Sequence, residues 1–321
     1  MIFKKEKNRS LIMCVTPLQM IIAEKIIQLN PKEDFDLLVI ALSDNDKYRY
    51  YYDRLKSICV RSLYYTTEKG IKGFFSYIGK LKKNKLNEKY ESLYLASIDS
   101  RHFQYILSRN KKANIYTFDD GTANIIPQSL YYSNSKPKLF KKIIWRGFGI
   151  KHYMEDVKKL SLLHYTIYKD APNIIEKTQF IKLYGDFKLS SNPVTKVVKI
   201  YLGQPLEEIS VDFNSQYVAK IIAKLDMDFY YPHPREKVIP KGEFDIITSQ
   251  LVFEDYIVSY LEENPEVMVE VYSFISSAML NIASLDRIEL NYIYDSYLYE
   301  KYKIFYEFAK NVFSIQTIRL N

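Results

Sequence analysis

Two short motifs place ionisable side chains directly after apolar, strand-like runs. Thr117-Phe118-Asp119-Asp120-Gly121-Thr122 offers two neighbouring carboxylates at a glycine turn, and Tyr231-Pro232-His233-Pro234-Arg235 holds one of only four histidines between two prolines. The prolines restrict the backbone around an imidazole whose ordinary pKa permits proton transfer near neutral pH. The chain therefore offers a carboxylate base and an imidazole acid, and the two motifs predict an active site between two domains.

The carboxylates allow more than one interpretation. Asp119 and Asp120 could bind a metal ion, deprotonate a hydroxyl, or form a tight turn in which Gly121 takes a positive φ. Asn124 adds an amide that could hold the turn or a sugar hydroxyl. Glu207, after the run Gly203-Gln204-Pro205, also follows a predicted strand and is another candidate base.

Three further polar residues suit an anionic or ribose-containing ligand. Ser276 and Ser277 follow an apolar run, so their hydroxyl and N–H groups could bind a phosphate or simply cap a helix. Glu254 opens a predicted helix, where it could complement the helix dipole or contact a ribose hydroxyl.

The first 125 residues alternate strand-like and helix-like patterns, which is typical of βαβ units. Helices are predicted from Pro17 to Leu29, from Asp46 to Ser57 and around His102–Arg109. A parallel sheet follows, with the Asp119–Asp120 turn at the carboxyl end of a strand, where open α/β sheets bind ligands. The predicted strands are Ser10–Val15, Asp36–Ala41, Ser62–Tyr65, Ser92–Ala96 and Ala113–Phe118.

A second alternating series begins near residue 197. The pattern is looser between Gln128 and Ser191, and a Ser190-Ser191-Asn192-Pro193 run is typical of a connection. We therefore predict domains 1–190 and 191–321, both α/β and Rossmann-like, with a tyrosine-rich helical end. The second set of strands is predicted at Val197–Leu202, Phe229–Tyr231, Asp245–Thr248, Val267–Tyr272 and Arg287–Asn291, with helices at 213–225 and 254–263.

The composition is that of a globular protein. The 321 residues are 47% hydrophobic and 26% charged, enough to bury the cores of two domains. No apolar run approaches the ~20 residues of a spanning helix, and the basic N-terminus lacks a signal-peptide core, so we expect a cytoplasmic protein. Cys14 and Cys59 are the only cysteines and are expected to be buried, which argues against zinc and redox chemistry.

The net charge of +8 does not by itself select a partner. Three lysine-rich stretches, Lys4–Arg9, Lys80–Lys85 and Lys136–Lys142, form either solvated faces or a patch for a membrane surface. The 30 tyrosines and 18 phenylalanines suit helix faces packed against a core, or a stacking surface. A basic nucleic-acid-binding protein is the alternative outside enzymes, but the sequence has no RNP-like motif and no zinc-finger spacing.

Several ordered motifs resemble those of the bacterial sialyltransferases of glycosyltransferase family 52. This family contains lipooligosaccharide sialyltransferases, and the chain resembles in particular the streptococcal capsular ones. The motifs extend over nearly the whole chain and are Cys14-Val15-Thr16-Pro17-Leu18-Gln19, Tyr94-Leu95-Ala96-Ser97, Thr117 to Thr122 with Asn124, His164-Tyr165-Thr166, Leu202-Gly203-Gln204-Pro205, Pro232-His233-Pro234-Arg235, Glu254-Asp255-Tyr256-Ile257 and Tyr272 to Ala278.

The resemblance implies a GT-B fold, in which two Rossmann-like domains with parallel sheets face each other across a cleft. It also implies inverting transfer of sialic acid from CMP-N-acetylneuraminic acid to a terminal galactose of a capsular or lipo-oligosaccharide glycan, with an α-2,3 linkage and without a metal ion or other cofactor. His233 would act on the departing CMP phosphate, Ser276 would bind that phosphate, and Glu254 would hold the ribose. The other donor-side residues are Gly203, Gln204, Pro234 and Ser277, and the acceptor-side residues are Thr16, Gln19 and Asn124.

The general base cannot be transferred directly from the family. The family pattern Gly-Ser-Pro-Asp is replaced here by Gly203-Gln204-Pro205-Leu206-Glu207, and Ser277 stands where a glycine is common. Either Glu207 is the base, which is the preferred candidate, or Asp119 or Asp120 is, as in a more distant sialyltransferase family with an Asp-Asp-Gly motif.

The expected partners are CMP-sialic acid and a galactose-terminated acceptor, with no nucleic acid. Related alternatives are a transferase for another CMP-activated acidic sugar, a polysialyltransferase, or a catalytically silent partner in capsule assembly. The sequence leaves open the linkage position and the acceptor structure, including whether the acceptor is lipid-linked. It also leaves open whether the protein contacts the inner face of the membrane and whether it forms a homodimer.

Overall fold

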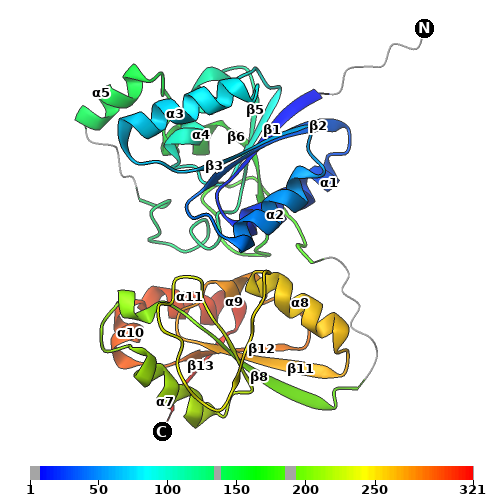
Figure 1. Cartoon of the computed structure of the whole chain (residues 1–321), viewed down its shortest axis with the longest axis vertical. Helices are drawn as coiled ribbons and strands as arrows, with labels where there is room; N and C mark the ends of the chain where they lie inside the picture. The colour runs from blue at the N-terminus through cyan, green and yellow to red at the C-terminus, as the bar shows by residue number, and fades with distance from the viewer. Residues whose placement is uncertain (1–7, 134–138, 185–192, 321) are drawn as a thin grey trace. The chain divides into compact units, whose positions relative to one another are not determined.

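The computed structural model describes residues 8–133, 139–184 and 193–320. The chain forms two compact units, Met1–Leu183 and Tyr184–Asn321, and each is described here by itself (Figure 1). The predicted boundary between residues 190 and 191 lies outside the described residues, as do residues 4–7 and 136–138 of two lysine-rich stretches.

The first unit is built on a sheet of seven parallel strands in the order β3-β2-β1-β4-β5-β6-β7. The register pairs Ile12 of β1 with Leu37 of β2 and with Tyr94 of β4. The strand order reverses between β1 and β4, which is the position where doubly wound sheets bind ligands. The strands are β1 Asn8–Cys14, β2 Glu33–Ala41, β3 Arg61–Thr66, β4 Ser92–Leu95, β5 Asn114–Phe118, β6 Ser161–Thr166 and β7 Thr178–Phe180.

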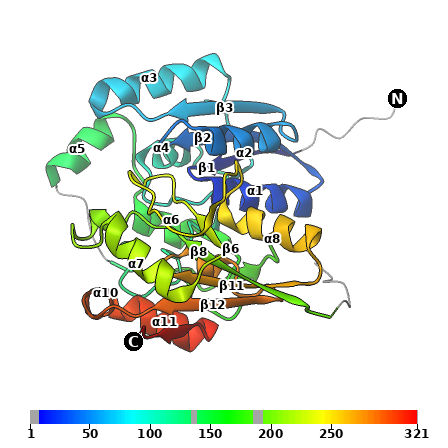
Figure 2. The same cartoon turned by 60° about the horizontal axis from the view of Figure 1, so that its bottom comes forward.

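Helices cover both faces of this sheet, with α1 and α2 on one face and α3 and α4 on the other (Figures 1 and 2). Helix α1 (Pro17–Leu29) has the predicted bounds because Pro17 occupies the first turn and the Thr16 hydroxyl accepts a hydrogen bond from the Gln19 N–H. The other helices are α2 Asp46–Lys56, α3 Gly70–Lys83, α4 Arg101–Arg109, α5 Leu139–Gly147 and α6 Met154–Leu160.

The sequence pattern is looser between Gln128 and Ser191, but the described residues of this stretch include helices and strands that were not predicted. This region contains α5, α6, β6 and β7, and it completes the first sheet. Strand β6 is missed because its apolar run is short and lies among lysines. The expectation for Cys59 is also wrong in part, since its side chain is half-buried whereas Cys14 is buried.

The second unit repeats the architecture with six parallel strands in the order β10-β9-β8-β11-β12-β13. The order again reverses, here between β8 and β11. The strands are β8 Lys196–Leu202, β9 Phe229–Tyr231, β10 Asp245–Ile246, β11 Val267–Ser273, β12 Ile288–Ile293 and β13 Gln316–Ile318. The helices are the 3₁₀ turn η1 Leu206–Glu208, α7 Ser215–Leu225, α8 Phe253–Glu263, α9 Ala278–Asn281, α10 Ser296–Lys301 and α11 Lys303–Phe313.

These two all-parallel sheets confirm the prediction of two Rossmann-like α/β domains. No helix within the described ranges is long and apolar enough to span a bilayer.

Candidate active site

A cavity lies at the carboxyl ends of the strands in the first unit, where the strand order reverses. Its volume is about 860 Å³. The loop after β1 contributes Thr16, the loop after β4 contributes Ser97 and Asp99, and the turn after β5 contributes Asp120. The sheet therefore brings polar groups that are far apart in the sequence to one place, as expected at the switch point of a doubly wound sheet.

Asp120 is the ionisable group at the centre of this arrangement. Its carboxylate accepts hydrogen bonds from the Gln19 amide on one oxygen and from the Tyr131 hydroxyl on the other. Burial raises the pKa of Asp120 to about 6, and the nearby charge of Asp99 acts in the same direction, although the hydrogen bonds oppose it. A carboxyl group with such a pKa can exchange protons near neutral pH, as a general base must.

Asp119 has a different role, although it is the neighbour of Asp120. Its side chain is fully buried, and one carboxylate oxygen lies 2.9 Å from His164 Nε2. The other oxygen accepts a hydrogen bond from the Ile167 N–H at 2.7 Å, and His164 Nδ1 lies 2.9 Å from Thr117 Oγ1. These bonds join the end of β5 to β6, so Asp119 holds the turn and is not accessible to a substrate.

Of the predicted acceptor-binding residues, one lines the cavity and two are buried. Thr16 lines the cavity, whereas Gln19 and Asn124 are fully buried. Gln19 donates to Asp120 and to Ser97 Oγ at 3.1 Å, and Asn124 Oδ1 accepts from the Asp120 N–H at 2.7 Å. Both amides therefore position Asp120 and do not face the cavity themselves, which differs from the direct acceptor contact expected from the sequence.

In the second unit, the predicted imidazole follows β9 on a loop fixed by a carboxylate. Glu236 accepts hydrogen bonds from the His233 N–H at 2.6 Å and from the Tyr230 hydroxyl at 2.5 Å. The Gln204 N–H also bonds to this carboxylate. Burial raises the pKa of Glu236, although these hydrogen bonds oppose the shift. Glu236 therefore ties together the loops after β8 and β9, a role that sequence reasoning missed.

The same geometry fixes the proton on the His233 ring. Nδ1 accepts a hydrogen bond from the Arg235 N–H at 3.1 Å. The neutral ring must therefore carry its proton on Nε2, because one ring nitrogen is a donor when the other is an acceptor. His233 can thus donate a hydrogen bond through Nε2, as a group that stabilises the charge on a departing phosphate requires.

Position 203 requires glycine because the side chains of Glu236 and Tyr230 lie too close to its Cα for a Cβ atom to fit. A Cβ atom at this position would lie 2.4 Å from Glu236 Oε2 and 2.7 Å from the Tyr230 hydroxyl oxygen. The next residue, Gln204, accepts hydrogen bonds through Oε1 from Ser273 Oγ and from the N–H groups of Phe274 and Ile275, at 2.9 to 3.1 Å. The Gly203-Gln204 pair therefore fixes the loops on both sides of the second switch point.

The remaining donor-side residues lie on neighbouring loops of the second unit. Glu254 is buried in the first turn of α8 and accepts a hydrogen bond from Asn281 Nδ2 at 2.7 Å. Ser276 is half-buried, and Ser277 is exposed at the start of α9, a helix of only four residues. Pro234 is exposed beside His233.

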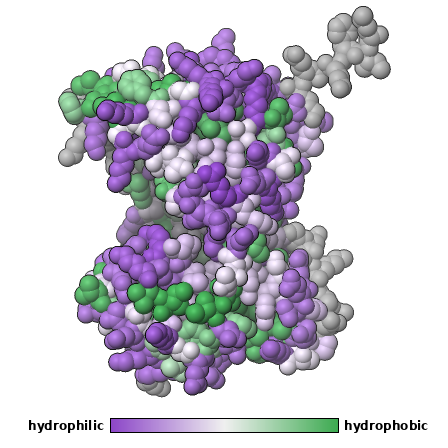
Figure 3. All heavy atoms as spheres, viewed as in Figure 1, coloured by the Kyte–Doolittle hydropathy of each residue, from purple (hydrophilic) through white to green (hydrophobic). Residues whose placement is uncertain are grey.

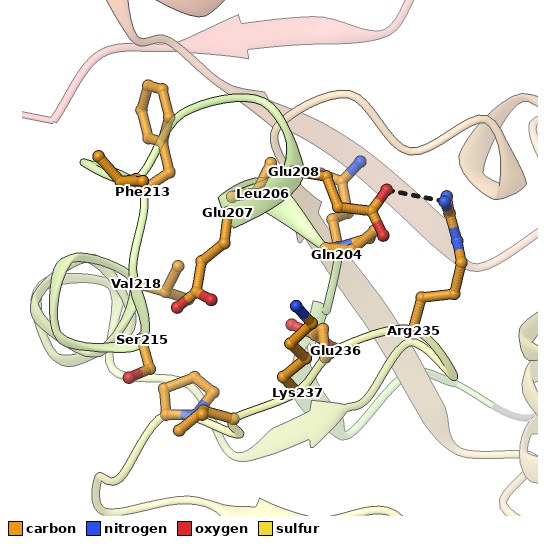
Figure 4. A pocket seen from close by; sticks show the side chains of 14 residues that line it. Gln204, Leu206, Glu207, Glu208, Phe213, Ser215, Val218, Arg235, Glu236 and Lys237 are labelled. Carbon is orange, nitrogen blue, oxygen red and sulfur yellow. Dashed lines mark hydrogen bonds and ion pairs between the residues drawn. The ribbon is translucent and has the colours of Figure 1, made fainter.

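Glu207 lines a second cavity, of about 430 Å³, between the loop after β8, α7 and the loop after β9. Figure 4 shows its exposed side chain directed into the cavity. Glu208 also lines this cavity, but its carboxylate forms an ion pair with Arg235 at 2.8 Å. Of the two carboxylates of this turn, Glu207 is therefore the one placed to meet a ligand.

The structure offers two cavities with candidate bases and a histidine oriented as a donor. Within the described ranges, no three His, Cys, Asp or Glu side chains come together as a metal ligand set. The chemistry that the described groups can perform is acid–base chemistry, with backbone and hydroxyl groups to hold an anion.

Comparison with known proteins gives relatives along nearly the entire chain. A CMP-N-acetylneuraminate:beta-galactoside alpha-2,3-sialyltransferase of Pasteurella multocida is 32% identical over 316 residues, covering 96% of this chain and 99% of its own. An N-acetyllactosaminide alpha-2,3-sialyltransferase of Haemophilus influenzae is 32% identical over 289 residues, covering 88% and 91%. Among solved structures, MurG of Acinetobacter baumannii has a TM-score of 0.48 at 8% identity, covering 98% of this chain and 86% of that one.

A family model provides the assignment. The model of glycosyltransferase family 52 matches residues 33–313, a range that begins in β2 and ends with α11. This match and the full-length relatives agree with the resemblance found in the sequence motifs, and the chain belongs to glycosyltransferase family 52.

Proposed function

We propose that this protein transfers sialic acid from CMP-N-acetylneuraminic acid to a terminal galactose, forming an α-2,3 linkage with inversion and without a metal ion. The observation that carries the proposal is the full-length similarity to two enzymes whose names state alpha-2,3-sialyl transfer. Membership of glycosyltransferase family 52 supports the same reaction class.

The second unit supplies the donor side of the proposal. As the bond between the sialic acid and the CMP phosphate breaks, negative charge grows on the phosphate. A hydrogen bond from His233 Nε2 offsets this charge, and Ser276 adds a hydroxyl. The loops that carry these groups are fixed by Glu236 and Gln204. In this proposal Glu254 contacts the ribose, as the family resemblance implies.

The first unit supplies the acceptor side. Its cavity is large enough for a sugar and is lined by Thr16, Ser97, Asp99 and Asp120. The acceptor hydroxyl must lose its proton to a carboxylate as it attacks the sialic acid. Glu207 and Asp120 both remain in the proposal, because each lines a cavity. Asp119 does not, because both of its oxygens are bonded in the core.

The test incubates purified protein with CMP-sialic acid and lactose in EDTA and follows CMP release together with sialyl-lactose. We expect turnover that persists in chelator and falls by at least ~10²-fold in His233→Ala, since positioned acid–base groups contribute this much. His152→Ala, a half-buried histidine in the first unit, is the matched control. CMP release without a sialylated product, or no release at all, would refute the proposal, and competition by other CMP-sugars defines the donor.

The same assay separates the two candidate bases. If Asp120 is the base, kcat/KM declines below a pH of about 6, and Asp120→Asn abolishes turnover while Glu207→Gln keeps it. If Glu207 is the base, Glu207→Gln loses turnover and Glu208→Gln, its neighbour in the ion pair with Arg235, does not. A capsular or lipo-oligosaccharide acceptor and a homodimer remain sequence-based predictions.

A further inference from the structure

Helices α3 and α5 form one face of the first unit. They pack through aromatic rings, with Phe74 of α3 lying 5.2 Å from Trp145 and 5.1 Å from Phe148 between ring centroids. These contacts use the inner sides of the helices. The large apolar side chains on the outer sides remain exposed. We use the name α3–α5 face for the surface formed by the exposed apolar residues Ile71, Phe75, Phe140 and Ile143 and the exposed cations Lys72, Lys141 and Arg146.

The apolar part of this face is unusually exposed. On α3, Ile71 and Phe75 have half or more of their surface exposed, and on α5 the exposed fractions of Phe140 and Ile143 are 74% and 62%. Ile71 and Phe75 are four residues apart, and Phe140 and Ile143 three, so each pair lies on one side of its helix. Figure 3 shows apolar surface over α5, with hydrophilic surface beside it.

The charged part has one sign. Helix α3 contains four lysines and α5 contains two lysines and Arg146, which gives seven cations and no carboxylate in the two helices. Lys72, Lys141 and Arg146 are exposed beside the apolar residues. The carboxylate that precedes α3, Glu68, lies 3.7 Å from Lys80 at the far end of the helix.

We propose that the α3–α5 face binds the surface of an anionic lipid bilayer. Exposed apolar side chains enter the boundary between headgroups and acyl chains, while neighbouring lysines and arginines meet the anionic headgroups. A second copy of the chain fits this face poorly, because symmetric pairing would bring two cation-rich surfaces together. A nucleic acid would use the cations but would leave the protruding Phe140 and Ile143 without an apolar partner.

The position of the face adds a consequence for the acceptor. Ile71, Lys141 and Trp145 of these helices also line the 860 Å³ cavity that contains Asp120, and the exposed Leu42 and Leu130 line it too. A bilayer bound at the α3–α5 face would therefore lie beside this cavity. If the proposed function holds, acceptor glycans anchored in that bilayer reach Asp120 more readily than free ones.

The binding test is vesicle sedimentation, which needs no turnover. We expect the wild-type chain to bind phosphatidylcholine vesicles that contain about 30 mol% of the anionic lipid phosphatidylglycerol, and to bind vesicles of pure phosphatidylcholine at least ~10-fold more weakly, because the cations lose their anionic partners. Phe75→Ser with Phe140→Ser, and Lys72→Glu with Arg146→Glu, should each weaken binding by ~10-fold or more. Neither pair lines the cavity.

Matched controls replace exposed residues elsewhere in the first unit. Ile58→Ser with Val60→Ser precedes β3, and Lys111→Glu with Lys112→Glu lies in the turn before β5. Both should bind vesicles as the wild type does, and unchanged melting curves show that all variants fold. Wild-type-like binding by the α3–α5 variants would overturn the proposal. Equal losses of vesicle binding in the control variants would also overturn it. The same holds if the wild-type chain binds RNA, or self-associates through this face, and does not bind vesicles.

A second measurement separates this proposal from the proposed function. Turnover of lactose should be the same in the wild type and in the α3–α5 variants, while turnover of a galactose-terminated glycolipid in anionic vesicles should fall ~10-fold in the variants. Absence of wild-type turnover on either acceptor would count against the function only. Equal glycolipid turnover in wild type and variants would count against the membrane face only.

Discussion

Replacing Asp120 by asparagine should make the first unit more stable at neutral pH. Burial raises the pKa of this carboxyl from 3.8 to about 6. Between these two values the folded chain holds a proton that the unfolded chain has lost, so the free energy of unfolding falls as the pH rises through this window. The variant lacks this ionisation. Its amide can still accept from Gln19 and donate to the Tyr131 oxygen, so the packing around position 120 is retained.

The magnitude follows from the size of the shift. Each pKa unit corresponds to about 1.36 kcal/mol, so ionised Asp120 costs the fold roughly 3 kcal/mol above pH 6. The stability difference between Asp120→Asn and the wild type should therefore grow by up to ~3 kcal/mol from pH 4 to pH 7 and remain constant above that. If Asp120 is the base, the same substitution should raise stability at neutral pH but lower turnover.

The assay uses the only tryptophan of the chain. Trp145 packs against Phe74 in the first unit, so its fluorescence reports the unfolding of this unit in urea. Curves at pH 4, 5, 6, 7 and 8 give the stability difference, and Asp53→Asn, on the exposed side of α2, is the control for the loss of one carboxylate elsewhere in the first unit. A difference that is constant with pH, or that favours the wild type at pH 7, would refute the argument from burial.

Three other substitutions test the positioning contacts. Gly203→Ala should lower stability by about 1–3 kcal/mol and reduce turnover, since the new methyl group would lie 2.4 Å from Glu236; an unchanged melting temperature and rate would contradict this. His164→Phe should lower the free energy of unfolding in urea by roughly 3 kcal/mol, because it leaves Asp119 buried without its ring partner, and it should lower kcat more than KM. A variant with unchanged stability and kinetics would show that the His164–Asp119 pair does not hold the turn. Gly79→Ala in α3 should instead stabilise the first unit by up to ~1 kcal/mol by tryptophan fluorescence, because the added methyl group meets nothing within 4 Å, and a loss would count against the exposure of this site.

Much of the fold was predictable because its signals are local. The helix Pro17–Leu29 has the predicted bounds, since a threonine cap and a proline mark its start within the sequence itself. The strands that end at the two chemical motifs were also located, because they are apolar runs followed by turn residues. Strands β6 and β13 were missed since short runs without a turn signal cannot be separated from loops by periodicity.

The candidate site was predictable in residue type and only partly in role. The sequence showed that His233 follows a strand, but the carboxylate that fixes its loop, Glu236, carried no signal beyond its place after Arg235. Gln19 and Asn124 were expected to face an acceptor because amides bind sugars. Both amides are instead buried beside Asp120, and for Gln19 this contact joins loops that are about 100 residues apart in the sequence. Contacts of that range leave no periodic trace in the sequence.

Sequence alone established that this chain folds as paired βαβ series, with carboxylates and a histidine at strand ends, because hydrophobic alternation and turn residues act over a few positions. Only the tertiary structure decided between Asp119 and Asp120. Neighbouring side chains in extended backbone point in opposite directions, so one carboxylate enters the core against His164 and the other reaches the cavity. Strand β6 determines which of these two directions leads into the core, and its His164 lies more than 40 residues after Asp119 in the sequence.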